Sequence, residues 1–170
     1  TKDGKLAAWE EHTIGTAVNG KPSRWTGVHP STFPIATSAH ARGSLTTYPM
    51  DTPSGPWRAP LSNTHAFVSQ CFINELAEAG GRDHVELLIE LMGEPRWLEP
   101  KTFRAMNTER AIGVIKLAAE KGGWGRAMPA GRGLGIAFYF CHAAHVAELA
   151  EVSVDDQGKV TVHKVTAAVD

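Results

Sequence analysis

The chain has 170 residues, of which 42% are hydrophobic and 21% are charged, a composition that suits one globular domain with its own core. Its formal net charge is -1, from 17 basic and 18 acidic residues, so no basic excess is available to bind the backbone of a nucleic acid. No run of about 18 apolar residues occurs, which argues against a membrane-spanning segment. We therefore expect one soluble domain over residues 1–170.

The N-terminal part, residues 1–60, is predicted to be rich in loops. Seven of the ten prolines lie between Pro22 and Pro60, where they remove backbone donors and fix φ too often for long helices. Within this part a strand is expected at residues 44–48, and a less regular one within residues 6–14. Long loops in a compact domain usually bind a ligand or pack against another domain.

Residues 64–122 are predicted to be helical. Between residues 64 and 79 the apolar residues recur at spacings of three and four, which indicates an amphipathic helix. Its apolar stripe is expected to face the core together with the C-terminal hairpin, and it consists of Phe67, Cys71, Phe72 and Leu76. Cys71 and Cys141 both lie in apolar runs, so we interpret them as small buried hydrophobes.

Two further helices have recognisable ends. Asp83, with Glu86 three residues later, resembles a capping box and opens a second helix that carries apolar residues up to Met92. Asn107 is expected to cap a third helix. That helix should end at Gly122–Gly123, because glycine readily adopts the left-handed conformation that stops a helix.

Residues 133–170 are predicted to form strands. The apolar period changes to two between residues 135 and 140, and residues 146–154 and 159–169 are typical of a hairpin around a polar turn at residues 155–158. Helices that precede a cluster of strands favour an α+β fold, in which the helices pack on one face of a mostly antiparallel sheet.

Motifs for metal binding or catalysis are weak. His142 and His145 have a His-x-x-His spacing, but side chains three apart on a strand point to opposite faces, so we interpret both as ordinary surface or core residues. The glycines at 131, 133 and 135 precede a strand rather than a helix, which does not suit a dinucleotide loop. We therefore assign no catalytic residue and no protein-bound metal.

The segment Gly55–Pro60, Gly-Pro-Trp-Arg-Ala-Pro, stands directly before the first predicted helix. The N-terminus of a helix presents free backbone amides to an anion, and Arg58 would add a two-pronged fork for a phosphate or an oxo group. Pro56 and Pro60 restrict the loop on both sides of Trp57 and Arg58. Packing of the tryptophan beside a solvated cation is the competing interpretation.

Gly55–Pro60, followed by Phe-Ile-Asn-Glu-Leu-Ala at residues 72–77, resembles the loop and helix of the isoquinoline 1-oxidoreductase beta subunits. These are large subunits of the xanthine dehydrogenase and aldehyde oxidase family. Two later segments, residues 117–137 and 146–170, resemble further blocks of this family in the same order. Several weak motifs in one order make the resemblance specific.

The resemblance implies a molybdenum hydroxylase that oxidises aldehydes or hydroxylates N-heterocycles with oxygen from water. Its cofactor would be a molybdenum-pterin, in bacteria usually the cytosine dinucleotide form, and a partner iron–sulfur small subunit would carry [2Fe-2S] clusters. Arg58 inherits a place beside the molybdenum ligands, with Trp57 and Ala59 framing the loop. Phe138 aligns with a strand whose aromatic residue contributes to the substrate pocket. The chain departs from the family pattern at Leu61, where the family typically has glycine.

Several parts of the family's active site have no match in this chain. The family's general base, a glutamate in a Gly-Glu motif, and its glutamine-bearing loop are both missing, and Asn74 replaces a family aspartate. Because the reaction needs a base, we expect the isolated chain to be inactive and to hold no molybdenum. A start at Thr1 and an end at Asp170, after a strand-like run, indicate an internal piece of a larger subunit whose other domains would be its partners.

Two matters stay open at the level of sequence. The compartment of the parent protein, bacterial cytoplasm or periplasm, is not predicted, and neither is its substrate. A free-standing α+β interaction module, which binds a protein partner through its Trp-rich loops, is the alternative function.

Overall fold

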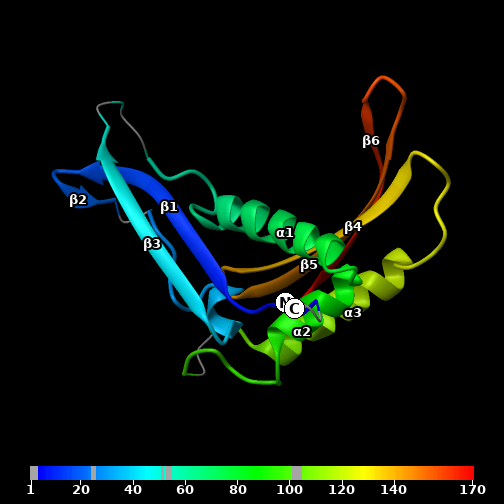
Figure 1. Ribbon diagram of the computed structural model, residues 1–170, viewed down its shortest axis with the longest axis horizontal. Coiled ribbons are helices and arrows are strands. Elements are labelled where there is room, and N and C mark those ends of the chain that lie inside the picture. The colour runs from blue at the N-terminus through cyan, green and yellow to red at the C-terminus, as the bar shows by residue number, and fades with distance from the viewer. Residues whose placement is uncertain (1–3, 24–25, 51, 53–54, 101–104) are drawn as a thin grey trace.

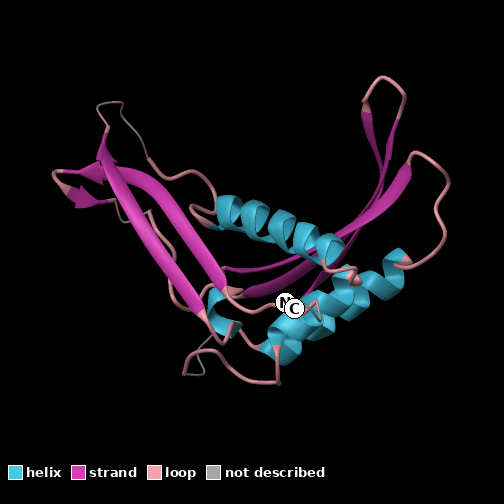
Figure 2. Ribbon diagram, in the orientation of Figure 1, coloured by secondary structure: helices cyan, strands magenta, loops and turns pink. Residues whose placement is uncertain are grey.

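The computed structural model describes residues 4–23, 26–50, 52, 55–100 and 105–170. In this part of the chain three α-helices accompany two three-stranded sheets, mostly antiparallel, which is an α+β fold as predicted (Figures 1 and 2). Figure 1 shows the first sheet on the left, set apart from the second sheet and from the helices beside it. None of the described helices has the length and apolarity to cross a bilayer.

The N-terminal part is more regular than predicted. It contains β1 (Trp9–Val18), β2 (Lys21–Pro22) and β3 (Ala41–Pro49), in the order β2-β1-β3. The two long strands run parallel from Trp9↔Ala41 to Ala17↔Pro49. A long loop-rich segment over residues 1–60 is therefore not what the structure shows. The prolines misled the prediction because those that the structure describes lie in the connections or at strand ends, where the missing N–H breaks no ladder, and Pro53 lies outside the described residues.

The three helices begin and end close to where the sequence places them. They are α1 (Ser62–Ala79), α2 (His84–Met92) and α3 (Thr108–Gly122), and a short 3-10 helix, η1 (Ile35–Thr37), precedes them. Asp83 Oδ1 accepts from Glu86 N at 3.0 Å, which confirms the capping box of α2. Asn107 Oδ1 accepts from Arg110 N at 3.0 Å, and Gly123 ends α3 with a φ of 73°.

The second sheet contains β4 (Arg132–Cys141), β5 (Ala144–Val154) and β6 (Val160–Val169), all antiparallel in the order β4-β5-β6. The predicted hairpin of β5 and β6 is confirmed. Side chains alternate along the strands, and α3 packs against the face that supplies the core. The buried residues of that face are Ile136, Phe138, His145, Ala147, Leu149 and Ala168.

Helix α1 does not bury the stripe that the sequence predicts. Phe67 is 71% exposed, Phe72 is 45% exposed and Cys71 is exposed as well, while Leu76 alone is half-buried. The residues buried from α1 are Ser69, Gln70, Ile73 and Ala77. The physical reason is that α1 lies along the edge of β4, where Gln70 Oε1 accepts from the backbone N–H of Phe138 at 2.9 Å. A polar residue therefore occupies the contact that the pattern assigns to an apolar one.

The two cysteines are also more exposed than expected. Cys71 is exposed on α1 and Cys141, at the end of β4, is half-buried; both are free thiols. The interpretation of Cys71 as a buried hydrophobe is wrong, because it belongs to the α1 stripe that faces outward.

Candidate functional site

The Trp57–Arg58–Ala59 loop lies directly before α1, as predicted, and is open to solvent. Trp57 is 83% exposed, and Arg58 is exposed as well. The guanidinium of Arg58 makes no hydrogen bond or ion pair with the described residues. Its charge is therefore available to a ligand or a partner, and nothing in the described domain holds it as part of the core.

Helix α1 begins in an unusual backbone conformation. Leu61, its N-cap, has φ 70° and ψ -48°, and Ala59 has a φ of 52°. These angles favour glycine, because the Cβ of any other residue crowds the backbone there. Position 61 is the one at which the resembling family has glycine. A strained turn is thus maintained just before the helix, which is where functional strain usually occurs.

The N-terminus of α1 is incompletely capped. Leu61 supplies no side-chain hydrogen bond, and no described residue accepts from the N–H of Ser62. The next two amides have local partners: Asn63 N–H donates to the carbonyl oxygen of Ala59 at 3.2 Å, and Thr64 N–H donates to Asn63 Oδ1 at 2.8 Å. Free amides at a helix start carry partial positive charge and attract acceptor atoms.

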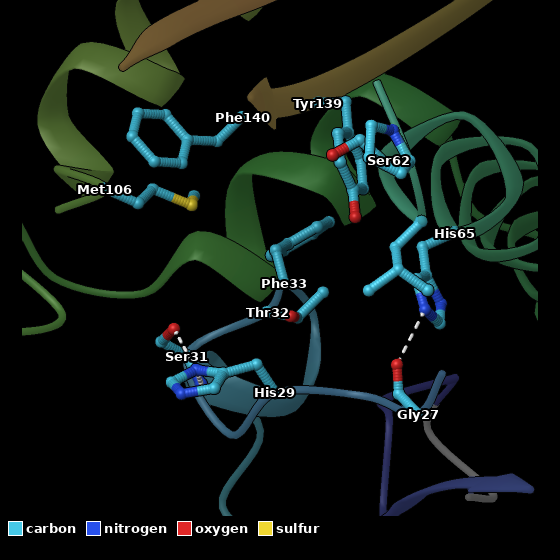
Figure 3. A pocket seen from close by; sticks show the side chains of 12 residues that line it. Gly27, His29, Ser31, Thr32, Phe33, Ser62, His65, Met106, Tyr139 and Phe140 are labelled. Atoms are coloured by element: carbon cyan, nitrogen blue, oxygen red, sulfur yellow. Dashed lines mark hydrogen bonds between the residues drawn. The ribbon is translucent and has the colours of Figure 1, made fainter. Parts of the chain in front are cut away.

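A cavity of ≈ 210 Å³ opens beside this helix start (Figure 3). Pro60, Leu61 and Ser62 form part of its wall, so the cavity adjoins the Arg58 loop along the chain. Figure 3 shows that the remaining side chains come from segments that are distant in sequence, and they include His29, Phe33, His65, Met106, Tyr139 and Phe140.

His65 is held by two acceptors at the wall of this cavity. Its Nδ1 lies 3.0 Å from Glu11 Oε1, and its Nε2 lies 3.1 Å from the carbonyl oxygen of Gly27, the contact dashed in Figure 3. Both ring nitrogens are thus occupied by oxygen atoms of other residues. His65 therefore has no free nitrogen to act as a base for Ser62, so a Ser-His-Glu nucleophile is not assembled here.

The cavity wall carries further polar groups. Burial, and then the negative charges of Cys141 and Glu11, raise the pKa of Tyr139 to about 12, so its hydroxyl stays protonated and donates. His29 Nδ1 and Ser31 Oγ lie 2.6 Å apart at the wall of the same cavity. The hydroxyl of Tyr139 and the free amide of Ser62 are donors, which suit a ligand with oxygen acceptors.

Phe138 is a core residue in this chain. Its side chain is 1% exposed, and its ring meets that of Phe33 edge to face with centroids 6.0 Å apart. The ring therefore packs between β4 and the loop before η1. The family resemblance instead suggested a substrate-facing residue, and the β4 residues that line the cavity are Tyr139 and Phe140.

His142 and His145 have separate environments, although not through the strand alternation that the sequence suggested, because His142 is not on a strand. His145 is 1% exposed, its Nε2 accepts from Asn107 N at 3.0 Å, and burial lowers its pKa. His142 lies in the turn between β4 and β5, with Nδ1 2.7 Å from Cys141 Sγ. The described residues contain no group of three or more His, Cys, Asp or Glu side chains placed to hold a metal ion.

Sequence reasoning missed the cavity residues because no local signal marks them. Gly27 and His65 line the cavity, and Glu11 of β1 holds His65 from outside it; the three residues come together from three segments of the chain. Comparisons with known proteins add no assignment: no protein-family model matches the chain, and no curated protein matches it either. The evidence for function is therefore the geometry of this loop and cavity together with the sequence motifs.

Proposed function

We propose that the chain forms part of the cofactor-binding region in the large subunit of a molybdenum hydroxylase, which oxidises aldehydes or hydroxylates N-heterocycles. The observation that carries the proposal is the Trp57–Arg58–Ala59 loop. It is exposed, its arginine has no partner among the described residues, and it leads into a helix whose first amide is free. The positive φ of Leu61, at a position that is glycine in the resembling family, also supports it.

The residues at this loop fit a molybdenum-pterin in the nature of their donors. Arg58 and the N–H of Ser62 would hold oxygen atoms of the cofactor or of its phosphates, as a guanidinium fork and a helix start do for anions. When bound, the molybdenum centre supplies the two-electron oxidation of the substrate. The role of this chain is to bind and orient, since no described carboxylate lies in the cavity that adjoins the loop.

The remaining parts of the site would come from elsewhere. The base and the glutamine loop of the family have no counterpart here, so turnover needs further domains of the large subunit. Electrons would leave through [2Fe-2S] clusters of an iron–sulfur small subunit. Purified alone, the chain should contain no molybdenum and reduce no dye with aldehydes or N-heterocycles. Stoichiometric molybdenum in the isolated chain would contradict this division of roles.

The test uses the large subunit that contains this chain, coexpressed with its iron–sulfur partner in a host that makes the pterin. The wild-type complex should contain molybdenum and reduce a dye with an aldehyde or N-heterocycle. Arg58→Ala should lower kcat on the order of 10²-fold, the loss typical of one donor aimed at developing charge. Molybdenum content and the iron–sulfur spectrum should stay unchanged. Arg58→Lys should rescue poorly, since lysine lacks the planar fork.

Lys116→Ala on the exposed side of α3 is the matched control, because it removes one cation far along the chain from the loop. It should leave kcat unchanged. A wild-type complex without molybdenum, or an Arg58→Ala complex with full activity, would overturn the proposed function.

A second candidate is an interaction module without catalysis, and one observation favours it: Trp57, Phe67 and Phe72 are large apolar residues left exposed. Aromatic side chains dominate the binding energy of protein interfaces. A complex that contains no molybdenum but forms a stable assembly through these residues would support this candidate instead.

A further inference from the structure

The second sheet carries an apolar surface on the side that faces away from α3. Cross-strand partners share a face of an antiparallel sheet. The register pairs Val146 with Val169, Ala150 with Val165, Val152 with Val162, and Val154 with Val160. We call this set the valine face. Its four β6 members are all more than half exposed. Figure 1 shows the far end of the β5–β6 hairpin projecting beyond the helices.

A β-bulge keeps the valines on one side of β6. The register moves by one residue on β5, from Glu151 to Val152, while it moves by two on β6, from Lys164 to Val162. Without the extra residue, Val162 and the end of β6 would alternate onto the α3 side, since a slip of one residue reverses every side chain. The bulge therefore extends the apolar surface along the whole strand.

A groove runs between α1 and this face of the sheet. Its main part has a volume of ≈ 620 Å³, and an adjoining part of ≈ 300 Å³ shares Gln70, Cys71, Ala137 and Glu148 with it. Small residues form the floor, among them Gly135 and Ala137. A Cβ added at Gly135 would meet no atom within 4 Å, so the space above the floor is open to an occupant.

Several polar atoms of the groove lack partners among the described residues, although Gln70 Oε1 is bonded to Phe138 N. Glu148 is the only charged strand residue on this face of the sheet, and neither Glu148 nor Glu75 makes an ion pair or hydrogen bond with the described residues. Gln70 is 5% exposed with Nε2 unpartnered, and His84 is 6% exposed with both ring nitrogens unpartnered. Buried polar groups are normally hydrogen-bonded, so these point to an occupant with polar as well as apolar atoms.

We propose that the groove and the valine face bind an amphipathic helix of a partner protein. Its apolar side would cover the valines, and a single Lys or Arg within that side would pair with Glu148. A helix suits the site because α1 already lies along the sheet, and a second helix packs beside a first at about 8–10 Å. The proposal does not depend on the proposed function, since it holds for a molybdenum enzyme and for an interaction module alike.

The charge of the groove favours a basic partner helix over a second copy of the chain and over a membrane surface. A second copy of the chain would bring its own Glu148 to an apolar surface, and no Lys or Arg of the described residues lines the groove to meet it. A membrane surface is usually anionic and would repel Glu148 and Glu75. A basic partner helix is the choice that neutralises both carboxylates while it covers the valines.

The test uses the full chain with Cys141→Ser, so that an environment-sensitive dye attaches to Cys71 at the wall of the groove. The probes are two helical peptides of about 18 residues with a leucine stripe, which differ only in a central lysine or glutamate within that stripe. The lysine peptide should bind about tenfold more tightly than the glutamate peptide. In the Glu148→Lys variant this preference should reverse.

Val165→Glu should abolish binding of the lysine peptide, whereas Val18→Glu is the matched control. Val18 lies on β1 and is similarly exposed, 57% against 52%, but it is remote from the groove residues in sequence and sheet. Equal affinity for both peptides, no binding of either, or an unchanged preference in Glu148→Lys would overturn the proposal. So would a dimer that Val165→Glu dissociates, or tighter binding to phosphatidylglycerol vesicles than to the lysine peptide.

Discussion

Helices α1 and α3 have similar apolar patterns but opposite relations to the core. In α3 the apolar side is buried, with Ile115 at 0% exposure, whereas in α1 Phe67 is 71% exposed. Both sequences repeat with the helical period, so the period identifies an apolar stripe without saying what covers it. The neighbouring elements decide: α3 faces the centre of the second sheet, while α1 meets α2 and the edge of β4, where Gln70 provides the contact.

The largest expected effect tests the α3 side of this comparison. Ile115→Ala should lower the free energy of unfolding by about 2–5 kcal/mol, because a fully buried side chain leaves a cavity between α3 and the sheet. Urea denaturation followed by circular dichroism measures the change. An unchanged midpoint would mean that α3 is not part of a packed core.

The fold was predictable where local chemistry alone defines an element. Caps at Asp83 and Asn107, the stop at Gly123 and the polar turn of the β5–β6 hairpin each act within a few residues, and the structure confirms them. The pairing of β1 with β3 was not predictable, because a parallel pair joins segments about 30 residues apart through a connection without any local signature.

The N-termini of α1 and α3 are capped differently, and substitutions of their capping residues should show this in the free energy of unfolding. Asn107→Ala should destabilise the chain by about 0.5–2 kcal/mol, since Asn107 satisfies the N–H of Arg110 at the start of α3. Asn63→Ala in the first turn of α1 is the control. Its oxygen contacts only the neighbouring Thr64, so stability should hardly move. If both variants lost the same free energy of unfolding, the N-termini of α1 and α3 would not differ in capping.

The two buried histidines should make the stability of the chain depend on pH in the acidic range. Burial lowers the pKa of His145, which lies on β5 and accepts from Asn107 N at the start of α3, and also the pKa of His84. The folded state therefore favours the neutral rings. Their contribution to the free energy of unfolding is fully present above about pH 6.5, the unfolded pKa of histidine, and is lost as the pH falls below that value. The loss in unfolding free energy from about pH 7.5 to about pH 5.5 should shrink in His145→Gln. In the exposed control His40→Gln the loss should persist, and an equal change in both would contradict the argument.

A substitution at the N-terminus of α1 should stabilise the chain rather than destabilise it. Leu61→Gly should raise the free energy of unfolding by about 1 kcal/mol, because glycine adopts φ 70° and ψ -48° without crowding. Thermal and urea denaturation measure the gain. A loss of stability would mean that burial of the Leu61 side chain at the cavity wall outweighs the backbone strain.

The candidate site could be predicted only in part, and for a physical reason. The Trp57–Arg58–Ala59 loop is one continuous segment before a helix, so its position and exposure follow from sequence. His65 and Tyr139 reach the cavity through long-range packing, which leaves no pattern of spacing. Phe138 looked accessible by resemblance, yet strand alternation turns it to the buried side of β4.

The smallest expected effect concerns the exposed stripe of α1. A Phe72 buried in the core would cost about 3–5 kcal/mol on truncation to alanine. At 45% exposure, with an edge contact to Trp9 at 5.4 Å between centroids, Phe72→Ala should cost about 1 kcal/mol.

Phe67→Ala should change the free energy of unfolding by less than about 0.5 kcal/mol, because its ring is mostly in water in both states and no aromatic contact involves it. Urea denaturation at two protein concentrations provides the measurement. A loss of several kcal/mol that grows with protein concentration would show that a second copy covers this stripe, and α1 would then resemble α3 in burying its apolar side.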